Sequence, residues 1–214
     1  VVQTQKFNNK AITYNYNKNI IEIGDDNMDL VQSRYYTEED YYNTPEDVRA
    51  ELIDGNLIYN MASPSSTHQF ILSELFGTIH SYIKSKGGKC RVVPAPFAVK
   101  LKEGRDTIVE PDISVICNPD NITERGYTGA PDWIIEIVSP SNSSHDYITK
   151  LKLYKDTGVK EYWIVDPMKR KVIVYHLEAG NFDMETYTFE DKIKTGIYDD
   201  LEIDFPSLDI PKDE

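Results

Sequence analysis

The chain has 214 residues, of which 40% are hydrophobic, 11% aromatic and 28% charged. This composition is that of a globular protein with one sizeable core, and it excludes a disordered chain. Because no apolar run is as long as a membrane span and no signal peptide is recognisable, we expect a cytoplasmic protein that does not contact a membrane.

The net charge of −13 argues at first against a nucleic-acid partner. The charge is unevenly distributed, however. Residues 1–60 carry 5 basic and 11 acidic side chains, residues 172–214 carry 3 and 12, and residues 61–171 carry 15 and 13. The middle of the chain is therefore slightly basic, which permits a polyanionic substrate without requiring one.

The chain has two cysteines, Cys90 and Cys117, and both lie in segments that resemble strands. In a cytoplasmic protein such residues are expected to be reduced and part of the core. We therefore predict two free thiols, and a disulfide between them is the less favoured alternative.

Residues 1–36 are predicted to form an N-terminal extension, because this stretch is polar, rich in asparagine and without clear period. Residues 37–214 contain no repeat or linker and are predicted to form a single domain. The helices expected in it begin at Thr37 and Thr44 and cover residues 70–83 and 143–157. The strands expected in it cover residues 51–59 (a hairpin), 90–101, 112–117, 133–138, 161–165, 172–177, 182–189 and 194–203. This order indicates an α/β or α+β fold with a mixed β-sheet.

Two of the apolar strands each carry an acidic residue. Asp112 opens the segment 112–117, and Glu136 lies inside the segment 133–138. An isolated charge in an apolar strand is costly unless it is paired or binds a metal ion. We expect the two strands to be neighbours, and these carboxylates are then suited to Mg²⁺, which proteins bind through one or two carboxylates plus water and phosphate oxygens. The alternative is structural: Asp112 caps a turn, and Glu136 pairs with a buried lysine.

The helix at 143–157 carries polar side chains on one face. Asp146, Lys150 and Tyr154 are spaced at i, i+4 and i+8. A lysine aimed at a metal site could orient the attacking water or stabilise the charge of a transition state. A surface salt bridge between Lys150 and Asp146 is the ordinary alternative.

Two further residues are candidates for accessory roles. Glu51 opens the hairpin and could add a carboxylate to the site, or it could be exposed to solvent. His68 opens the long helix after Ser65-Ser66-Thr67, where most histidines are capping or surface residues.

Six motifs of this chain occur in the same order in a known family. They are E-L-I-D-G at 51–55, the histidine at 68, E-P-D at 110–112, P-D-W-I-I-E-I-V-S-P-S at 131–141, D-x-x-x-K-x-x-x-Y at 146–154 and G-V-K-E-Y-W-I-V-D-P at 158–167. As a set, they resemble the Uma-type restriction endonuclease family of the PD-(D/E)xK nuclease superfamily, over about residues 37–178.

The resemblance implies a restriction endonuclease-like core, with a mixed β-sheet flanked by helices. It also implies Mg²⁺- or Mn²⁺-dependent hydrolysis of phosphodiester bonds in DNA by a homodimer. On this pattern Asp112, Glu136 and the backbone carbonyl of Ile137 hold the metal, and Glu51 assists. One position departs from the superfamily: the lysine expected two residues after the second acid is Val138, and Lys150 is the matching cation of the family.

Two alternatives to a DNA endonuclease stay open. The acidic flanks and the missing lysine at position 138 suit a catalytically inactive nuclease fold that binds DNA or protein. Hydrolysis of a smaller phosphoester is the other alternative, because the core motifs select the bond and not the size of the substrate.

Overall fold

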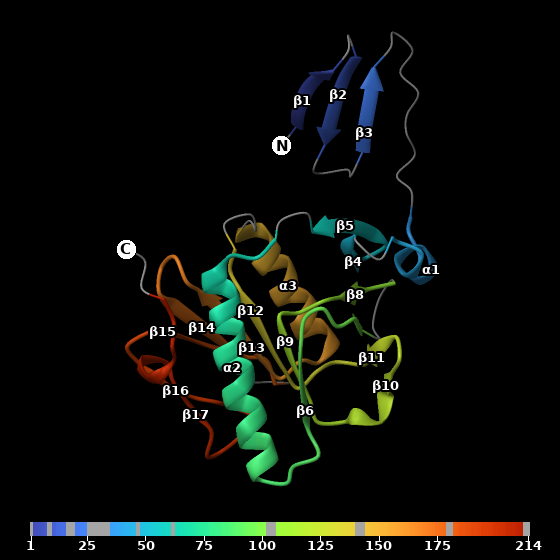
Figure 1. Ribbon diagram of the computed structural model, residues 1–214. Coiled ribbons are helices and arrows are strands. Elements are labelled where there is room, and N and C mark those ends of the chain that lie inside the picture. Colours follow the sequence, from blue (N-terminus) through green and yellow to red (C-terminus); the bar gives the residue numbers. More distant parts are fainter. Residues whose placement is uncertain are drawn as a thin grey trace.

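The structure is a computed structural model that describes residues 2–7, 10–15, 20–24, 35–45, 48–60, 63–101, 106–139, 144–178 and 182–211. For residues 2–7, 10–15, 20–24, 60 and 144–146 it describes the backbone only. The centre of the molecule is a mixed β-sheet with one long helix on each face (Figure 1). This is the restriction endonuclease-like α+β architecture that the motifs implied.

The central sheet has six strands in the order β15-β14-β13-β12-β9-β6. The strands are β6 (Arg91–Pro94), β9 (Ile113–Ile116), β12 (Trp133–Ile137), β13 (Glu161–Asp166), β14 (Lys171–His176) and β15 (Asp183–Thr188). β12 and β13 are parallel, and the other neighbours are antiparallel. β9 and β12 pair directly, as the sequence predicted for the two strands that carry the acids.

The two long helices cover opposite faces of this sheet because side chains alternate between its faces. α2 (Ser66–Ser85) packs a stripe of buried residues on one face, against the odd-numbered side chains of β9 and β12. The stripe is Ile71, Leu75, Ile79 and Ile83. α3 (Ser144–Thr157) packs Tyr147 and Tyr154 on the other face. Both helices stop where the sequence placed Gly87 and Gly158, which have φ of 62° and 94°.

A second sheet, of order β10-β11-β7-β8-β4-β5, carries the predicted hairpin. Its strands are β4 (Arg49–Ile53), β5 (Asn56–Asn60), β7 (Val99–Lys100), β8 (Ile108–Val109), β10 (Ile122–Thr123) and β11 (Gly126–Thr128). The turn at Asp54-Gly55 has positive φ at both residues, as a tight two-residue hairpin requires. Leu52 of β4 pairs with Ile108 of β8, which brings the hairpin next to the segment that leads into β9.

The remaining elements are short. They are β1 (Val2–Phe7), β2 (Lys10–Asn15), β3 (Ile20–Gly24), α1 (Glu38–Tyr42), β16 (Lys192–Lys194), β17 (Glu202–Asp204) and the 3-10 turns Pro119–Asn121 and Phe205–Ser207. β1, β2 and β3 form their own antiparallel sheet. Thr37 caps α1 in a capping box with Asp40. The division into an extension at 1–36 and a domain at 37–214 stays a prediction.

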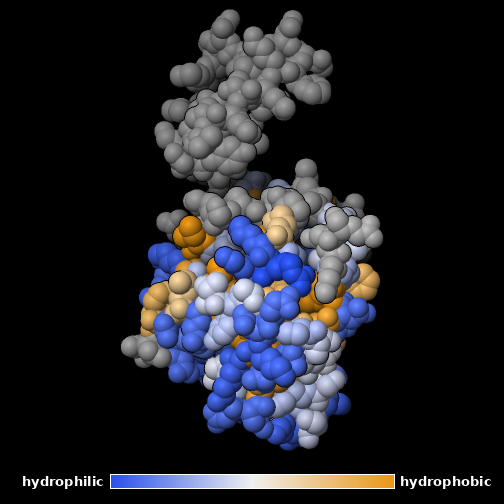
Figure 2. Space-filling view, turned by 90° about the vertical axis from the view of Figure 1, so that its left-hand side faces the viewer, coloured by the Kyte–Doolittle hydropathy of each residue, from blue (hydrophilic) through white to orange (hydrophobic). Residues whose placement is uncertain are grey.

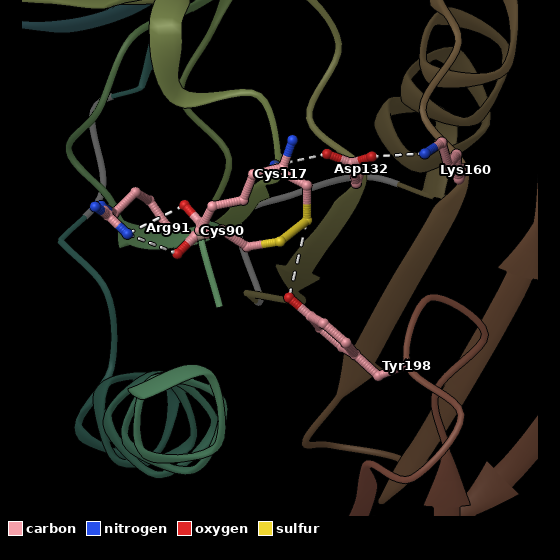
Figure 3. The surroundings of a disulfide bond; sticks show 7 residues. Cys90, Arg91, Cys117, Asp132, Lys160 and Tyr198 are labelled. Atoms are coloured by element: carbon pink, nitrogen blue, oxygen red, sulfur yellow. Dashed lines mark hydrogen bonds and ion pairs between the residues drawn. A yellow bond between two sulfur atoms is a disulfide. The ribbon is translucent and has the colours of Figure 1, made fainter. Parts of the chain in front are cut away.

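The prediction of two free thiols is wrong. Cys90 and Cys117 form a disulfide between the residues that flank β6 and β9 (Figure 3). Arg91 pairs with Ile116, so the antiparallel register places the two cysteines directly opposite each other. The prediction relied on compartment, whereas the register of two distant strands decides which cysteines meet.

Two expected elements also differ from the structure. No helix begins at Thr44, although residues 46 and 47 lie outside the description. The strand expected at 90–101 is divided into β6 and β7, because the prolines Pro94 and Pro96 interrupt the backbone pairing.

One face, which Figure 2 shows, is largely hydrophilic, and its apolar side chains lie in small separate groups. Within the described parts of the chain, no helix has both the length and the apolar character needed to span a membrane.

Candidate active site

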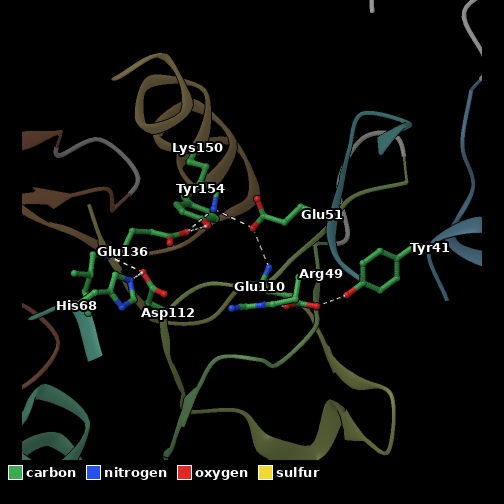
Figure 4. Close-up of polar contacts among 10 residues, drawn as sticks. Tyr41, Arg49, Glu51, His68, Glu110, Asp112, Glu136, Lys150 and Tyr154 are labelled. Carbon is green, nitrogen blue, oxygen red and sulfur yellow. Dashed lines mark hydrogen bonds and ion pairs between the residues drawn. The ribbon is translucent and has the colours of Figure 1, made fainter. Parts of the chain in front are cut away.

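A buried lysine joins two acids from different sheets. Lys150 comes from α3, and its Nζ lies 2.9 Å from Oε1 of Glu51 on β4 and 2.9 Å from Oε1 of Glu136 on β12 (Figure 4). The side chain of Lys150 is only 12% exposed, and those of the two acids are 5% and 7% exposed. Lys150 is therefore an internal cation shared by two carboxylates, and its placement excludes the alternative of a simple surface lysine.

Tyr154 completes the polar face of α3. It lies one helical turn after Lys150, and its hydroxyl donates a hydrogen bond to Oε1 of Glu136 at 2.8 Å. Both donors thus reach the same carboxylate oxygen. Among the described residues, none donates a hydrogen bond to the other oxygen, Oε2 of Glu136. The i, i+4 spacing in the sequence predicted this shared face correctly.

Burial and charge shift the pKa values of this group. Burial, together with the charges of Asp112 and Glu51, raises the pKa of Glu136 to about 7, against the lowering effect of Lys150. Burial alone would lower the pKa of Lys150, but the charges of Glu136 and Glu51 outweigh it and hold the pKa above its ordinary value. Burial and the charge of Glu136 also raise the pKa of Tyr154 well above its usual range. Lys150 therefore stays protonated and Tyr154 stays neutral, while Glu136 titrates near neutrality.

Asp112 lies beside Glu136, at the residue before β9 begins. Its Oδ2 accepts a hydrogen bond from the backbone N–H of Ile137 at 2.8 Å and lies 3.3 Å from Nε2 of His68. His68 is in the first turn of α2, and its backbone N–H is capped by Ser65. Its side chain is buried on Asp112, so it is neither a surface residue nor a cap.

The pKa of His68 is raised. Burial favours the neutral ring and lowers the pKa, but the hydrogen bond to Asp112 and its charge raise it by more. The contact with Asp112 therefore favours the protonated imidazole, which donates from Nε2.

Glu110 is part of the site and was missed by the sequence reasoning. Its backbone N–H donates to Oε1 of Glu51 at 3.1 Å, and its carboxylate accepts a hydrogen bond from Tyr41 and faces Arg49 at 3.5 Å. Burial and the charge of Glu110 raise the pKa of Tyr41. Glu110 was visible in the sequence only as the first residue of the E-P-D motif, and nothing local indicated that it contacts α1.

Two predictions lie outside the described residues. Asp146 is in α3, but its side chain is not described, and residues 140 and 141 of the motif at 131–141 are not described either. Val138, at the position where the superfamily has lysine, is 8% exposed and packs in the core beneath α3.

The residues present fit a metal ion bound by two carboxylates. In a strand the N–H and the C=O of one residue point the same way. Because the N–H of Ile137 is directed at Asp112, its carbonyl lies on the same side. Neither Oδ1 of Asp112 nor Oε2 of Glu136 accepts a hydrogen bond from any residue that the structure describes. Two carboxylate oxygens and one carbonyl are a donor set that Mg²⁺ and Mn²⁺ accept, with water completing the shell. Within the described part of the chain, no larger cluster of three or more acidic, histidine or cysteine side chains could hold a metal.

Comparison with known proteins gives consistent results. Residues 38–204 match the model of the Uma2 family, described as "Putative restriction endonuclease". The chain is 24% identical over 146 residues to an uncharacterised protein, slr1290, of Synechocystis sp., a match that covers 67% of this chain and 75% of that protein. A crystal structure from Anabaena variabilis, titled as a putative nuclease belonging to DUF820, aligns with a TM-score of 0.67 and 25% identity over 80% of this chain and 96% of that one.

The fold and the site define a protein of the restriction endonuclease-like nuclease class. The family model covers most of the chain, including every residue of the site. The chain belongs to the Uma2 family.

Proposed function

We propose that this protein is a metal-dependent endonuclease that hydrolyses phosphodiester bonds in DNA. The observation that carries the proposal is the convergence of Asp112, Glu136 and Lys150 from two neighbouring strands and a helix. Family membership and the nuclease neighbour support hydrolysis, and the carboxylate pair supports Mg²⁺ or Mn²⁺ as the cofactor.

Each residue then has a part in the reaction. Asp112, Glu136 and the carbonyl of Ile137 would hold the ion. A bound ion of this kind lowers the pKa of its water and neutralises charge on the scissile phosphate. Lys150 keeps its proton and is close enough to Glu136 to orient a water beside the same carboxylate. Glu51 holds the ammonium group of Lys150 from the opposite side.

Lys150 is also the candidate replacement for the superfamily lysine that is missing at position 138. The cation that the superfamily places two residues after the second acid is supplied here by the helix that follows, 2.9 Å from that acid. The same contact is the buried lysine pair that the structural alternative expects for Glu136, so a catalytically inactive fold stays an outcome of the test.

The test is nicking and linearisation of supercoiled plasmid in Mg²⁺ and in Mn²⁺, with EDTA controls. Wild type is compared with Asp112→Asn and Lys150→Ala, and with Lys152→Ala as a matched control, because the side chain of Lys152 is 80% exposed on the same helix. We expect wild type and Lys152→Ala to cut only with metal, and the two site variants to lose at least about 100-fold in rate. Equal cutting by all four proteins would contradict the proposal.

Absence of cutting by every protein is resolved by a second measurement. Mn²⁺ is titrated calorimetrically into wild type and Asp112→Asn. Binding by wild type alone would mean that the metal site exists and that the plasmid lacks the target sequence. No binding by either protein would mean that the fold has no metal site. Hydrolysis of a small phosphodiester, with no cleavage of plasmid, would favour the alternative of a smaller phosphoester substrate.

A homodimer and a cytoplasmic location stay predictions. Cleavage of both strands of a duplex would suit two copies of the site. Sedimentation velocity of the purified protein distinguishes a 24.6 kDa monomer from a dimer.

A further inference from the structure

The two carboxylates of the site are held in the same way. Oε1 of Glu136 receives two donors, Lys150 and Tyr154. Oδ2 of Asp112 also receives two, the backbone N–H of Ile137 and the ring of His68. In each case one oxygen is fully engaged, and the other receives no hydrogen bond from the described residues.

His68 differs from the other three donors in its origin. Ile137, Lys150 and Tyr154 lie on β12 and α3, whereas His68 projects from α2 on the opposite face of the sheet. Its position follows from the buried stripe of α2, because His68 precedes Ile71 and Leu75 at helical spacing and is 6% exposed. The packing of α2 against the sheet therefore sets where Nε2 lies, and with it the rotation of the Asp112 carboxylate.

We propose that His68 is a positioning residue for Asp112, which it holds with Oδ2 turned inward so that Oδ1 is left for the metal ion. This inference rests on the proposed function and deepens it. A carboxylate with only the Ile137 N–H on Oδ2 could rotate about its terminal bond, because that torsion is soft. The second donor, 3.3 Å away on another element, restricts the rotation. Partners of this kind, which contact the ligand and not the metal, typically account for 10–100-fold in metal affinity.

The experiment uses two polar replacements of different reach. The amide nitrogen of glutamine can occupy the position of Nε2, so His68→Gln keeps the donor. Asparagine is one methylene shorter and cannot reach Oδ2, so His68→Asn loses it. His80→Asn, at an exposed histidine of the same helix, is the control for general effects on α2.

Mn²⁺ chloride is titrated calorimetrically into each protein, with Asp112→Asn as the reference for loss of a ligand. Thermal melts without metal identify the temperature range in which every variant is folded. We expect His68→Gln and His80→Asn to bind Mn²⁺ within about 3-fold of wild type, and His68→Asn to bind roughly 10–100-fold more weakly.

Three other results would overturn the inference. Wild-type affinity in His68→Asn would mean that the hydrogen bond does not position Asp112. Equal loss in His68→Gln, His68→Asn and Asp112→Asn would make His68 itself a metal ligand. If wild type binds no Mn²⁺, the proposed function fails as well, which the other two results do not imply.

Discussion

Two buried glutamates on adjacent parallel strands are held in opposite ways. Counted over the whole residue, Glu136 of β12 is 5% exposed, and one of its oxygens receives both of its donors, including a charged lysine. Glu161 of β13 is 1% exposed, and both of its oxygens are engaged by neutral donors. Trp163 donates to one oxygen at 2.6 Å, and the backbone N–H groups of Gly196 and Ile197 donate to the other at 2.7 and 2.9 Å.

The difference separates a structural carboxylate from a reactive one. Glu161 ties the loop before β17 to the start of β13, and no acceptor oxygen is left without a donor. Oε2 of Glu136 receives no hydrogen bond from the described residues, and the pKa of Glu136 is raised to about 7 by burial and by the neighbouring acids. A buried acid is thus a candidate for function when its donors leave part of it unused.

The largest expected effect comes from removing the cation beside Glu136. Lys150→Met leaves Glu136 and Glu51 buried without their counter-charge, which costs about 3–5 kcal/mol of unfolding free energy. Denaturant unfolding at pH 7.5 measures the loss. Lys152→Met on the same helix is the control, and its change is expected to stay below about 1 kcal/mol because that ion pair is exposed. Equal stability of Lys150→Met and wild type would show that the shared lysine does not stabilise the site.

Much of this site could be predicted from the sequence, because local spacing determines which side chains share a helix face or a strand. Lys150 and Tyr154 share a helix face for that reason, and the apolar strands around Asp112 and Glu136 were predicted as neighbours. The family resemblance, and not the spacing, matched Lys150 to the second acid. Glu110 and Glu161 could not be recognised, because their partners lie 69 and 35 residues away along the chain and depend on how whole elements pack. The disulfide was mispredicted for the same reason.

A smaller effect is expected at the structural glutamate. In Glu161→Gln an amide NH₂ replaces one acceptor oxygen, so at least one of the three N–H donors loses its partner. The cost is roughly 1–3 kcal/mol. Denaturant unfolding measures it, and plasmid cleavage at a temperature where the variant is folded should be unchanged. A loss of cleavage without a loss of stability would mean that Glu161, like Glu136, takes part in the reaction and is not a purely structural residue.

The pH dependence of stability tests the shift at Glu136. Burial raises the pKa of Glu161 as well, although its hydrogen bonds from Trp163, Ile197 and Gly196 act against that shift. The folded-state pKa of Glu136, about 7, exceeds its ordinary value of 4.5, so the folded protein binds the proton more tightly than the unfolded chain does. The contribution of protonated Glu136 to the free energy of unfolding is therefore fully present below pH 4.5 and is lost as the pH rises through 7. Between these values it should decline by up to about 1.4 kcal/mol per pH unit.

Comparison of wild type with Glu136→Gln between pH 5 and 7.5 isolates this contribution. The variant lacks the titrating group, so its stability should decline less steeply over the interval. Glu202→Gln, at an exposed acid of β17, should follow wild type. Parallel curves for wild type and Glu136→Gln would mean that the carboxyl is ionised at all these pH values.

The most direct measurement of the central claim is calorimetric titration of Mn²⁺ into wild type, Glu136→Gln and Glu161→Gln, all folded at the same temperature and at pH 8. The account predicts that wild type and Glu161→Gln bind Mn²⁺ with the same affinity and that Glu136→Gln binds at least about 100-fold more weakly, since it loses a ligand oxygen. Wild-type affinity in Glu136→Gln would contradict the assignment of the metal site.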